Sequence, residues 1–327
     1  MQHRVVAERI NGSSEKIVAR ILVTGAGGFI GTGLCPALAA RGHGVRAGLR
    51  HAAAIEGAEA VILGDIGPAT DWSPALDGVD TVIHLAQRAH AGPDPAALAA
   101  EPEAVAALVR AMGTSGARRL VLVSSVKAMG ETTAPGRPFR PDDEPRPEDA
   151  YGRGKLASEN AARAAVRAAG VELVVIRLPL VYGPGVKANF AALIRLAASG
   201  LPLPFAALDN RRSLISRDNL VDLLAVAATH PQAAGMTLLV RDDVDLSTPE
   251  LIRALSAGLG CQARLFPVPA TLFTTLRPLP VVGPRIARLT GSLQVDDSVT
   301  RAALGWAPPV SAAAALAATA RAFAVGL

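Results

Sequence analysis

The sequence has few cysteines and few aromatic residues, and it lacks a long hydrophobic run. Its 327 residues include two cysteines, Cys35 and Cys261, whose separation suits neither a zinc site nor a disulfide framework. Aromatic residues make up 3% of the chain, too few for the stacked rings of a single-strand nucleic-acid platform. No apolar run reaches the roughly 18 residues of a membrane span. We therefore expect no metal, no nucleic-acid partner and no membrane span.

No region of the chain is dominated by charge of one sign. The 33 basic and 28 acidic residues are scattered and give a net charge of +5. A dispersed basic balance suits a small polyanion such as a nucleotide diphosphate, whereas binding to duplex DNA requires a concentrated basic stripe. Residues 1–16 carry charged side chains and no apolar segment of a signal peptide. With so few cysteines, this favours a reduced, cytoplasmic setting.

Half of the residues are hydrophobic, which is enough for a large core. Short apolar runs alternate with helical patterns, which predicts an α/β fold with a Rossmann-type doubly wound parallel sheet. We expect strands at 20–24, 45–49, 60–63, 79–85, 119–123 and 173–178, and helices at 29–41, 95–112, 151–169, 188–199, 217–228, 249–259 and 310–324. We expect a polar lead-in at 1–18, a dinucleotide-binding domain at 19–178, and a smaller α/β part at 179–327 that mainly binds substrate and is interleaved with the first.

The first expected strand runs directly into a glycine-rich loop and then a helix. Such glycines permit a tight turn, close approach to a pyrophosphate and close packing of helix on strand. The N-terminus of the following helix offers amide donors and a positive dipole to phosphates. This context favours dinucleotide binding over a plain turn. The expected cofactor contacts here are Gly25, Gly28, Phe29, Ile30 and Gly31.

The second expected strand ends in Leu49-Arg50-His51, without the acidic residue that usually binds the ribose hydroxyls of NAD. An arginine at this position suits the 2′-phosphate of NADP. We therefore expect NADP(H) to be favoured, with NAD(H) possible, although Arg50 could also be a solvated surface residue. Asp65 and Ile66 follow the third expected strand and are expected near the adenine, unless Asp65 only caps a turn.

A serine, a tyrosine and a lysine form the expected catalytic set. The fifth expected strand leads into Ser125, and Tyr151 and Lys155 lie one helical turn apart on a later helix. Free tyrosine has a pKa of about 10, which a nearby ammonium group lowers. Tyr151 can then exchange a proton with a hydroxyl or carbonyl oxygen while hydride moves at the adjacent carbon. Ser125 is expected to hydrogen-bond that oxygen.

These motifs together resemble the extended short-chain dehydrogenase/reductases of the NAD-dependent epimerase/dehydratase family. The resemblance is carried by TGAGGFIG (24–31), VIHLAQRAH (82–90), VLVSSVKAMGE (121–131), YGRGK (151–155), RLPLVYGPGVKANF (177–190), NRRSLISRDNL (210–220) and LGWAPP (304–309). It is strongest toward UDP-sugar 4-epimerases and UDP-4-keto-sugar reductases such as UDP-N-acetylquinovosamine dehydrogenase. Met129 and Leu180 depart from the usual Tyr and Asn of the family, which affects the sugar and its orientation.

The resemblance implies further site residues and partners. Leu85 and Ala86 would border the nicotinamide ribose, where Lys155 also binds the cofactor. Asn189, Arg212 and Tyr182 would contact a UDP-sugar substrate. A guanidinium can bind phosphate oxygens through two donors, although Arg212 could also form a structural ion pair. A homodimer is possible, because family members commonly form one.

Three functions remain open from the sequence. The first is 4-keto reduction of a UDP-4-keto-6-deoxy-hexose or hexosamine by NADPH, in surface polysaccharide synthesis, and the sequence slightly favours it because of Arg50. The second is a UDP-hexose 4-epimerase of the UDP-glucose or UDP-GlcNAc type that retains tightly bound NAD. The third is a non-catalytic NADP-binding protein, which the intact Ser125, Tyr151 and Lys155 set argues against.

Overall fold

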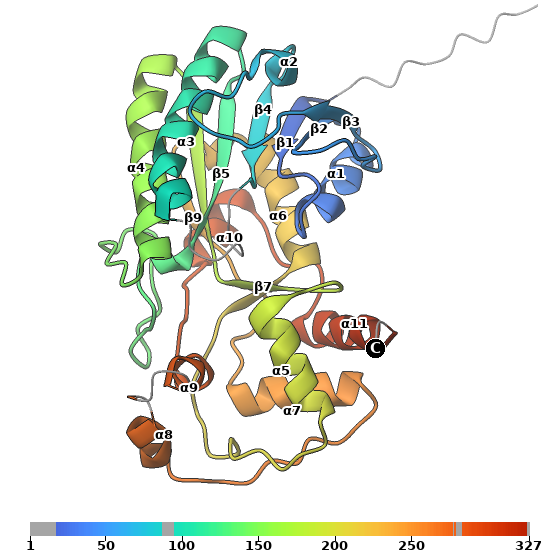
Figure 1. Cartoon of the computed structure of the whole chain (residues 1–327), viewed down its shortest axis with the longest axis vertical. Helices are drawn as coiled ribbons and strands as arrows, with labels where there is room; N and C mark the ends of the chain where they lie inside the picture. Colours follow the sequence, from blue (N-terminus) through green and yellow to red (C-terminus); the bar gives the residue numbers. More distant parts are fainter. Residues whose placement is uncertain (1–17, 87–94, 277, 279–282, 326–327) are drawn as a thin grey trace, which may run out of the picture.

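A seven-stranded parallel sheet forms the centre of the molecule (Figure 1). The computed structural model describes residues 18–86, 95–276, 278 and 283–325. The strands are ordered β3-β2-β1-β4-β5-β6-β9, and every neighbouring pair is parallel. They span β1 (Arg20–Thr24), β2 (Gly44–Leu49), β3 (Glu59–Ile62), β4 (Thr81–His84), β5 (Arg119–Ser125), β6 (Glu172–Leu178) and β9 (Thr237–Leu239). This is the Rossmann-type fold that the alternating pattern predicts.

Helices cover both faces of the sheet, so its central strands are buried on both sides. One face carries α1 (Gly31–Ala39) and α6 (Arg217–Thr229), and the other carries α2 (Ser73–Leu76), α3 (Pro95–Ser115) and α4 (Ala150–Ala169) (Figure 1). In β1, Ile21 and Val23 belong to the core under α1 and α6, whereas Leu22 belongs to the core under α3 and α4. A strand whose side chains point alternately into two apolar cores must be apolar throughout. This explains why these strands can be predicted from the sequence.

A smaller lobe lies beyond the carboxyl ends of the strands (Figure 1). It contains the two-stranded parallel sheet β7 (Leu180–Tyr182) and β8 (Leu214–Ser216), with α5 (Ala188–Ala198), α7 (Thr248–Gly258), α8 (Ala270–Leu276), α9 (Gly283–Thr290) and α11 (Ala312–Val325). The helix α10 (Ser298–Leu304) contacts β9, and 3-10 turns span η1 (Val126–Ala128) and η2 (Pro231–Ala233). The segment after residue 178 thus builds this lobe and also supplies α6 and β9 to the large sheet.

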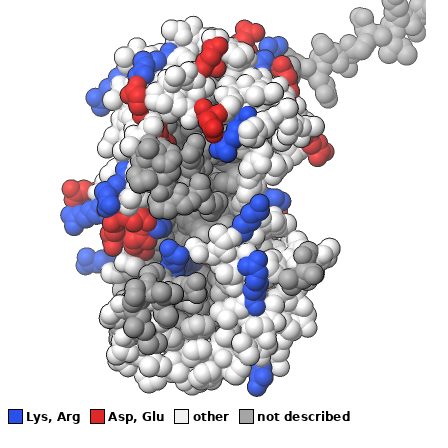
Figure 2. Space-filling model, in the orientation of Figure 1, with Lys and Arg blue, Asp and Glu red and all other residues white. Residues whose placement is uncertain are grey.

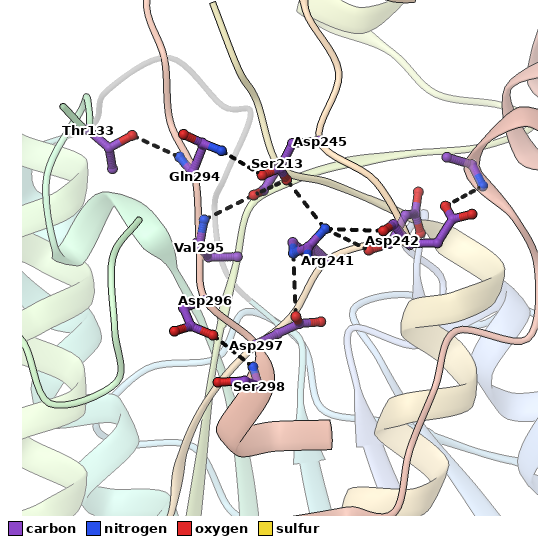
Figure 3. Close-up of polar contacts among 12 residues, drawn as sticks. Thr133, Ser213, Arg241, Asp242, Asp245, Gln294, Val295, Asp296, Asp297 and Ser298 are labelled. Atoms are coloured by element: carbon purple, nitrogen blue, oxygen red, sulfur yellow. Dashed lines mark hydrogen bonds and ion pairs between the residues drawn. The ribbon is translucent and has the colours of Figure 1, made fainter. Parts of the chain in front are cut away.

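A polar network fixes the junction between the lobes (Figure 3). The Ser213 hydroxyl, next to β8, donates to Asp245 Oδ1 at 2.6 Å and accepts from the Val295 amide at 2.9 Å. The Gln294 side chain donates through Nε2 to Asp245 Oδ2 at 2.7 Å, and the Gln294 backbone N–H donates to Thr133 Oγ1 at 3.1 Å. The network therefore joins the segment that follows β5 to the segments around β8 and α10, and it fixes the backbone beside Arg212.

Positive and negative side chains are mixed over the upper part of the face drawn in Figure 2, and only isolated positive ones are visible near its lower end. None of the helices formed by the described residues combines the length and apolar character needed to cross a bilayer. Among those same residues, no group of three or more His, Cys, Asp or Glu side chains is placed to hold a metal ion.

Candidate functional site

The glycine loop forms a cradle that side chains would fill. Gly25 has φ +69°, and a Cβ atom there would lie 2.9 Å from the Ala86 amide nitrogen. A Cβ atom at Gly31 would lie 2.5 Å from Ala26 Cα, and one at Gly28 would lie 3.1 Å from the Gly25 carbonyl oxygen. Since α1 begins at Gly31, its N-terminus lies at this loop. A helix N-terminus in such a cradle fits a dinucleotide pyrophosphate.

Gly31→Ala is expected to weaken cofactor binding, whereas Gly27→Ala is expected to leave it nearly unchanged. The first variant forces the Ala26 backbone to move, whereas a Cβ atom at Gly27 meets only Leu49 Cδ2 at 3.5 Å. Overpacking of this kind costs about 1–3 kcal/mol, or roughly 5- to 150-fold in Kd. Calorimetric titration with NAD of both variants, first freed of bound nucleotide, measures the difference. Equal affinities would show that the close contact at Gly31 does not shape the cofactor site.

Residues after β4 lie against the same loop. The Leu85 amide donates to the Thr24 carbonyl at 3.2 Å, and the Ala86 amide donates to Thr24 Oγ1 at 3.3 Å. Thr24 Oγ1 also lies 2.9 Å from His84 Nδ1. Burial, with the charge of Lys155, lowers the pKa of His84 to about 4. His84 is therefore a neutral hydrogen-bonding residue that fixes the expected cofactor residues Leu85 and Ala86 beside Gly25.

The structure brings together the residues expected at the adenosine end. Arg50 Nε lies 2.9 Å from Asp65 Oδ1, and both side chains are more than half exposed. The neighbouring Ile66 packs partly buried against the core under α3 and α4. A 2′-phosphate at Arg50 would have to share this guanidinium with the Asp65 carboxylate. The ion pair therefore weakens the sequence argument for NADP.

The close approach of α4 to η1 assembles the catalytic set. A Cβ atom at Gly152 would lie 2.3 Å from the Lys127 carbonyl oxygen, so only glycine permits this contact. The Asp149 carboxylate caps α4 by accepting from the Gly152 amide at 2.6 Å. The side chains of Tyr151 and Ser125 are hydrogen-bonded to each other, and Lys155 Nζ lies 5.0 Å from the centroid of the Tyr151 ring. The three expected catalytic residues therefore lie together at the carboxyl end of β5.

The site also contains Glu101, a partly buried carboxylate that our sequence analysis did not identify. Lys155, which is 2% exposed, forms an ion pair with it at 2.7 Å between Nζ and Oε1. Glu101 is spaced by four and seven residues from the buried Val105 and Leu108. An acidic residue on the apolar face of a helix is therefore the signal that could have revealed it.

Burial and charge act on the two central ionisable groups in opposite ways. Burial raises the pKa of Tyr151 to about 12, with a further contribution from the negative charge of Glu101, while the hydrogen bond with Ser125 opposes the shift. Burial lowers the pKa of Lys155, and the ion pair with Glu101 opposes that shift. Tyr151 is therefore a proton donor in the structure described here.

Two of the three expected substrate residues lie together, and they meet an arginine that the sequence analysis missed. Arg288 Nη1 donates to Asn189 Oδ1 at 3.4 Å, and Arg212 Nη1 donates to the Arg288 carbonyl at 2.6 Å. Burial lowers the pKa of Arg212, and the negative charge of Glu131 opposes that shift. Glu131 pairs with Lys127 at 2.8 Å, which places this group on the same side as η1 and the catalytic set.

The third expected substrate residue, Tyr182, lies in the core of the smaller lobe. It is fully buried, its hydroxyl donates to Asp242 Oδ2 at 2.6 Å, and its ring stacks on Phe190 at 5.2 Å between centroids. The hydroxyl of Tyr182 is thus committed to Asp242, while its ring lies against Phe190, the neighbour of Asn189 in α5.

Comparison with known proteins identifies the family. The profile of the NAD dependent epimerase/dehydratase family matches residues 21–238. The chain is 39% identical to a UDP-glucose 4-epimerase of Vibrio cholerae over 94% of this chain and 96% of that protein. It is 32% identical to a 3-diazoavenalumate denitrifying reductase of Streptomyces sp over 88% of this chain and 96% of that protein.

A solved structure agrees with the fold. The UDP-glucuronic acid 4-epimerase of Bacillus cereus in complex with NAD superposes with a TM-score of 0.74 at 21% identity, covering 93% of this chain and 98% of that chain. The fold, the glycine cradle and the family match lead to one conclusion: the chain belongs to the NAD dependent epimerase/dehydratase family of extended short-chain dehydrogenase/reductases and is an NAD(P)-dependent enzyme.

Proposed function

We propose that the protein is a UDP-hexose 4-epimerase that retains NAD. The redox chemistry rests on Tyr151 and Ser125 beside Lys155. The observation that favours the epimerase is the ion pair of Arg50 with Asp65 at 2.9 Å, because it opposes the 2′-phosphate of NADP. The relative that shares 39% identity over 94% of this chain is a UDP-glucose 4-epimerase. From the sequence alone, Arg50 slightly favours a reductase, and the proposal reverses that preference.

The residues of this chain divide the chemistry between them. Bound NAD supplies a hydride acceptor and later a hydride donor. Tyr151, as tyrosinate, takes the proton of the C4 hydroxyl during oxidation and returns it to the carbonyl oxygen during reduction. Ser125 hydrogen-bonds the same oxygen and keeps it within reach of Tyr151. Lys155 stabilises the tyrosinate and binds the ribose hydroxyls of the cofactor.

Asn189, Arg212 and Arg288 bind the diphosphate of the nucleotide-sugar in this proposal. Two guanidinium groups and an amide that lie together form a cluster suited to phosphate oxygens. The exposed Arg288 side chain and the partly buried Arg212 come from different segments of the smaller lobe. Anchoring the nucleotide away from the reacting carbon leaves a 4-keto sugar free to turn and present its other face to the nicotinamide.

The first experiment is to denature the purified protein and identify the nucleotide that it releases. An epimerase must hold its cofactor through a whole cycle, so we expect about one NAD per chain, together with interconversion of UDP-glucose and UDP-galactose or of their N-acetyl forms. Release of NADP, or a protein that is empty and binds NADPH more tightly than NADH, would contradict the proposal.

The second candidate is 4-keto reduction of a UDP-4-keto-6-deoxy sugar. Arg50 favours it, because a cation at the end of β2 suits the 2′-phosphate of NADP. The Asp65 carboxylate at 2.9 Å from Arg50 opposes it. Oxidation of NADPH on addition of a UDP-4-keto sugar, without epimerisation of UDP-hexoses, would favour the reductase. The same catalytic residues serve both reactions.

A further inference from the structure

A buried ion pair distinguishes the surroundings of Lys155. The ammonium is almost completely buried, and its 2.7 Å contact with Glu101 comes from α3, an element that carries no other member of the proposed catalytic set. The Glu101 side chain is itself 13% exposed. An ammonium group has three donors, so Glu101 leaves other donors of Lys155 available for the ribose hydroxyls of a cofactor.

The titratable groups near the catalytic set come from four elements. Glu101 belongs to α3, His84 to β4, Lys127 to η1, and Asp149 caps α4. His84 is neutral at physiological pH because its pKa lies near 4. Lys127 is paired with both Glu131 and Asp149 at 2.8 Å. Among the described residues, Glu101 is the charged group with the largest effect on the pKa of Tyr151, after the effect of burial itself.

We propose that Glu101 is a positioning residue that compensates the charge of Lys155 and thereby keeps Tyr151 protonated. An uncompensated ammonium beside a tyrosine favours tyrosinate, and a carboxylate on that ammonium cancels most of this effect. Tyr151 then loses its proton only when further positive charge arrives, as it does with an oxidised nicotinamide. The inference rests on the proposed function only in taking Tyr151 as the acid–base group.

The variant Glu101→Gln tests this inference without any substrate. It removes the charge but keeps the volume and an acceptor oxygen for Lys155. The chain has only two tyrosines, and burial raises the pKa of Tyr182 beyond that of Tyr151. The near-ultraviolet absorbance of tyrosinate therefore reports Tyr151, with Tyr151→Phe as the blank. We expect the Glu101→Gln titration to occur about 1–3 pH units lower than that of the parent protein.

Glu103→Gln is the matched control. Glu103 lies two residues away on α3, but its side chain is 59% exposed and pairs with Arg110 at the surface. Its titration should coincide with that of the parent protein. Two results for Glu101→Gln would overturn the inference: a titration that coincides with that of the parent protein, or no tyrosinate signal before the variant unfolds. Either result would mean that Lys155 loses its own charge in the variant or does not act on Tyr151.

A kinetic readout links the charge to turnover. Because the pKa of Tyr151 falls in Glu101→Gln, the pH at which kcat/KM rises should fall with it, while Glu103→Gln keeps the parent profile. If no UDP-hexose is turned over, the proposed function fails, but the tyrosinate titration still decides the role of Glu101. A Glu101→Gln profile that moves to higher pH would contradict the inference.

Discussion

Tyr151→Phe is expected to lower kcat by about 10²- to 10⁴-fold, the usual contribution of a positioned acid–base group. Affinity for the cofactor should stay within a few-fold of the parent value, because the phenyl ring keeps the shape that packs beside Lys155. Epimerisation of UDP-hexoses measures kcat, and calorimetric titration with NAD of protein freed of bound nucleotide measures the affinity. Full turnover by Tyr151→Phe would show that the catalytic assignment is wrong.

Tyr182→Phe removes the other tyrosine hydroxyl of the chain and serves as the comparison. Its hydroxyl donates to the buried Asp242, so its loss leaves a buried acceptor with one partner fewer. Such a loss costs about 1–3 kcal/mol of stability. We expect kcat to change little in this variant. A kcat as low as that of Tyr151→Phe would instead support the sequence-based expectation that Tyr182 contacts substrate.

Arg177→Met is expected to lower the free energy of unfolding by about 3–5 kcal/mol, because it leaves a buried carboxylate without its cation. Arg177 donates to Glu159 at 2.8 Å, and the two side chains are 5% and 1% exposed. Glu159 also accepts from the Ser124 hydroxyl at 2.6 Å. The pair thus ties β5 and β6 to α4, directly behind the catalytic set. Urea denaturation followed by circular dichroism measures the loss.

Arg110→Met supplies the matched control for that prediction. Arg110 forms an ion pair with Glu103, and both side chains are 59% exposed. Exposed pairs contribute about 0–1 kcal/mol. A loss of similar size in the two variants would show that burial does not set the energetics of the Arg177–Glu159 pair.

The large sheet could be predicted from the sequence because its strands lie between two apolar cores. The first, second, third, fifth and sixth strands begin within one residue of the expected positions, and β4 begins two residues later than expected. The strands β7, β8 and β9 were not predicted. Each has three residues, too few to show a period of two. Their existence depends on pairing across long sequence separations.

The residues of the candidate site also fall into those that the sequence predicts and those that it does not. Glycine spacing and the Tyr151–Lys155 pair are local patterns, so the sequence shows them. The Arg50–Asp65 ion pair depends on the β2–β3 register, which sets Leu49 against Ile62. The meeting of Arg288 with Asn189 depends on how α9 lies against α5. Side-chain partners of this kind follow from tertiary packing, which a single sequence does not specify.

The position of β9 has a consequence for how the chain folds during its synthesis. The edge of β6 stays without its neighbour until residues 237–239 have been made, since Val175 pairs with Thr237. At about 5–20 residues per second, the intervening 60 or so residues take roughly 3–12 s to synthesise. During that interval the nascent chain presents an open apolar strand edge, which is a site of mispairing between chains. Chaperone dependence of this protein should therefore be greatest for ribosome-bound chains that end between β6 and β9.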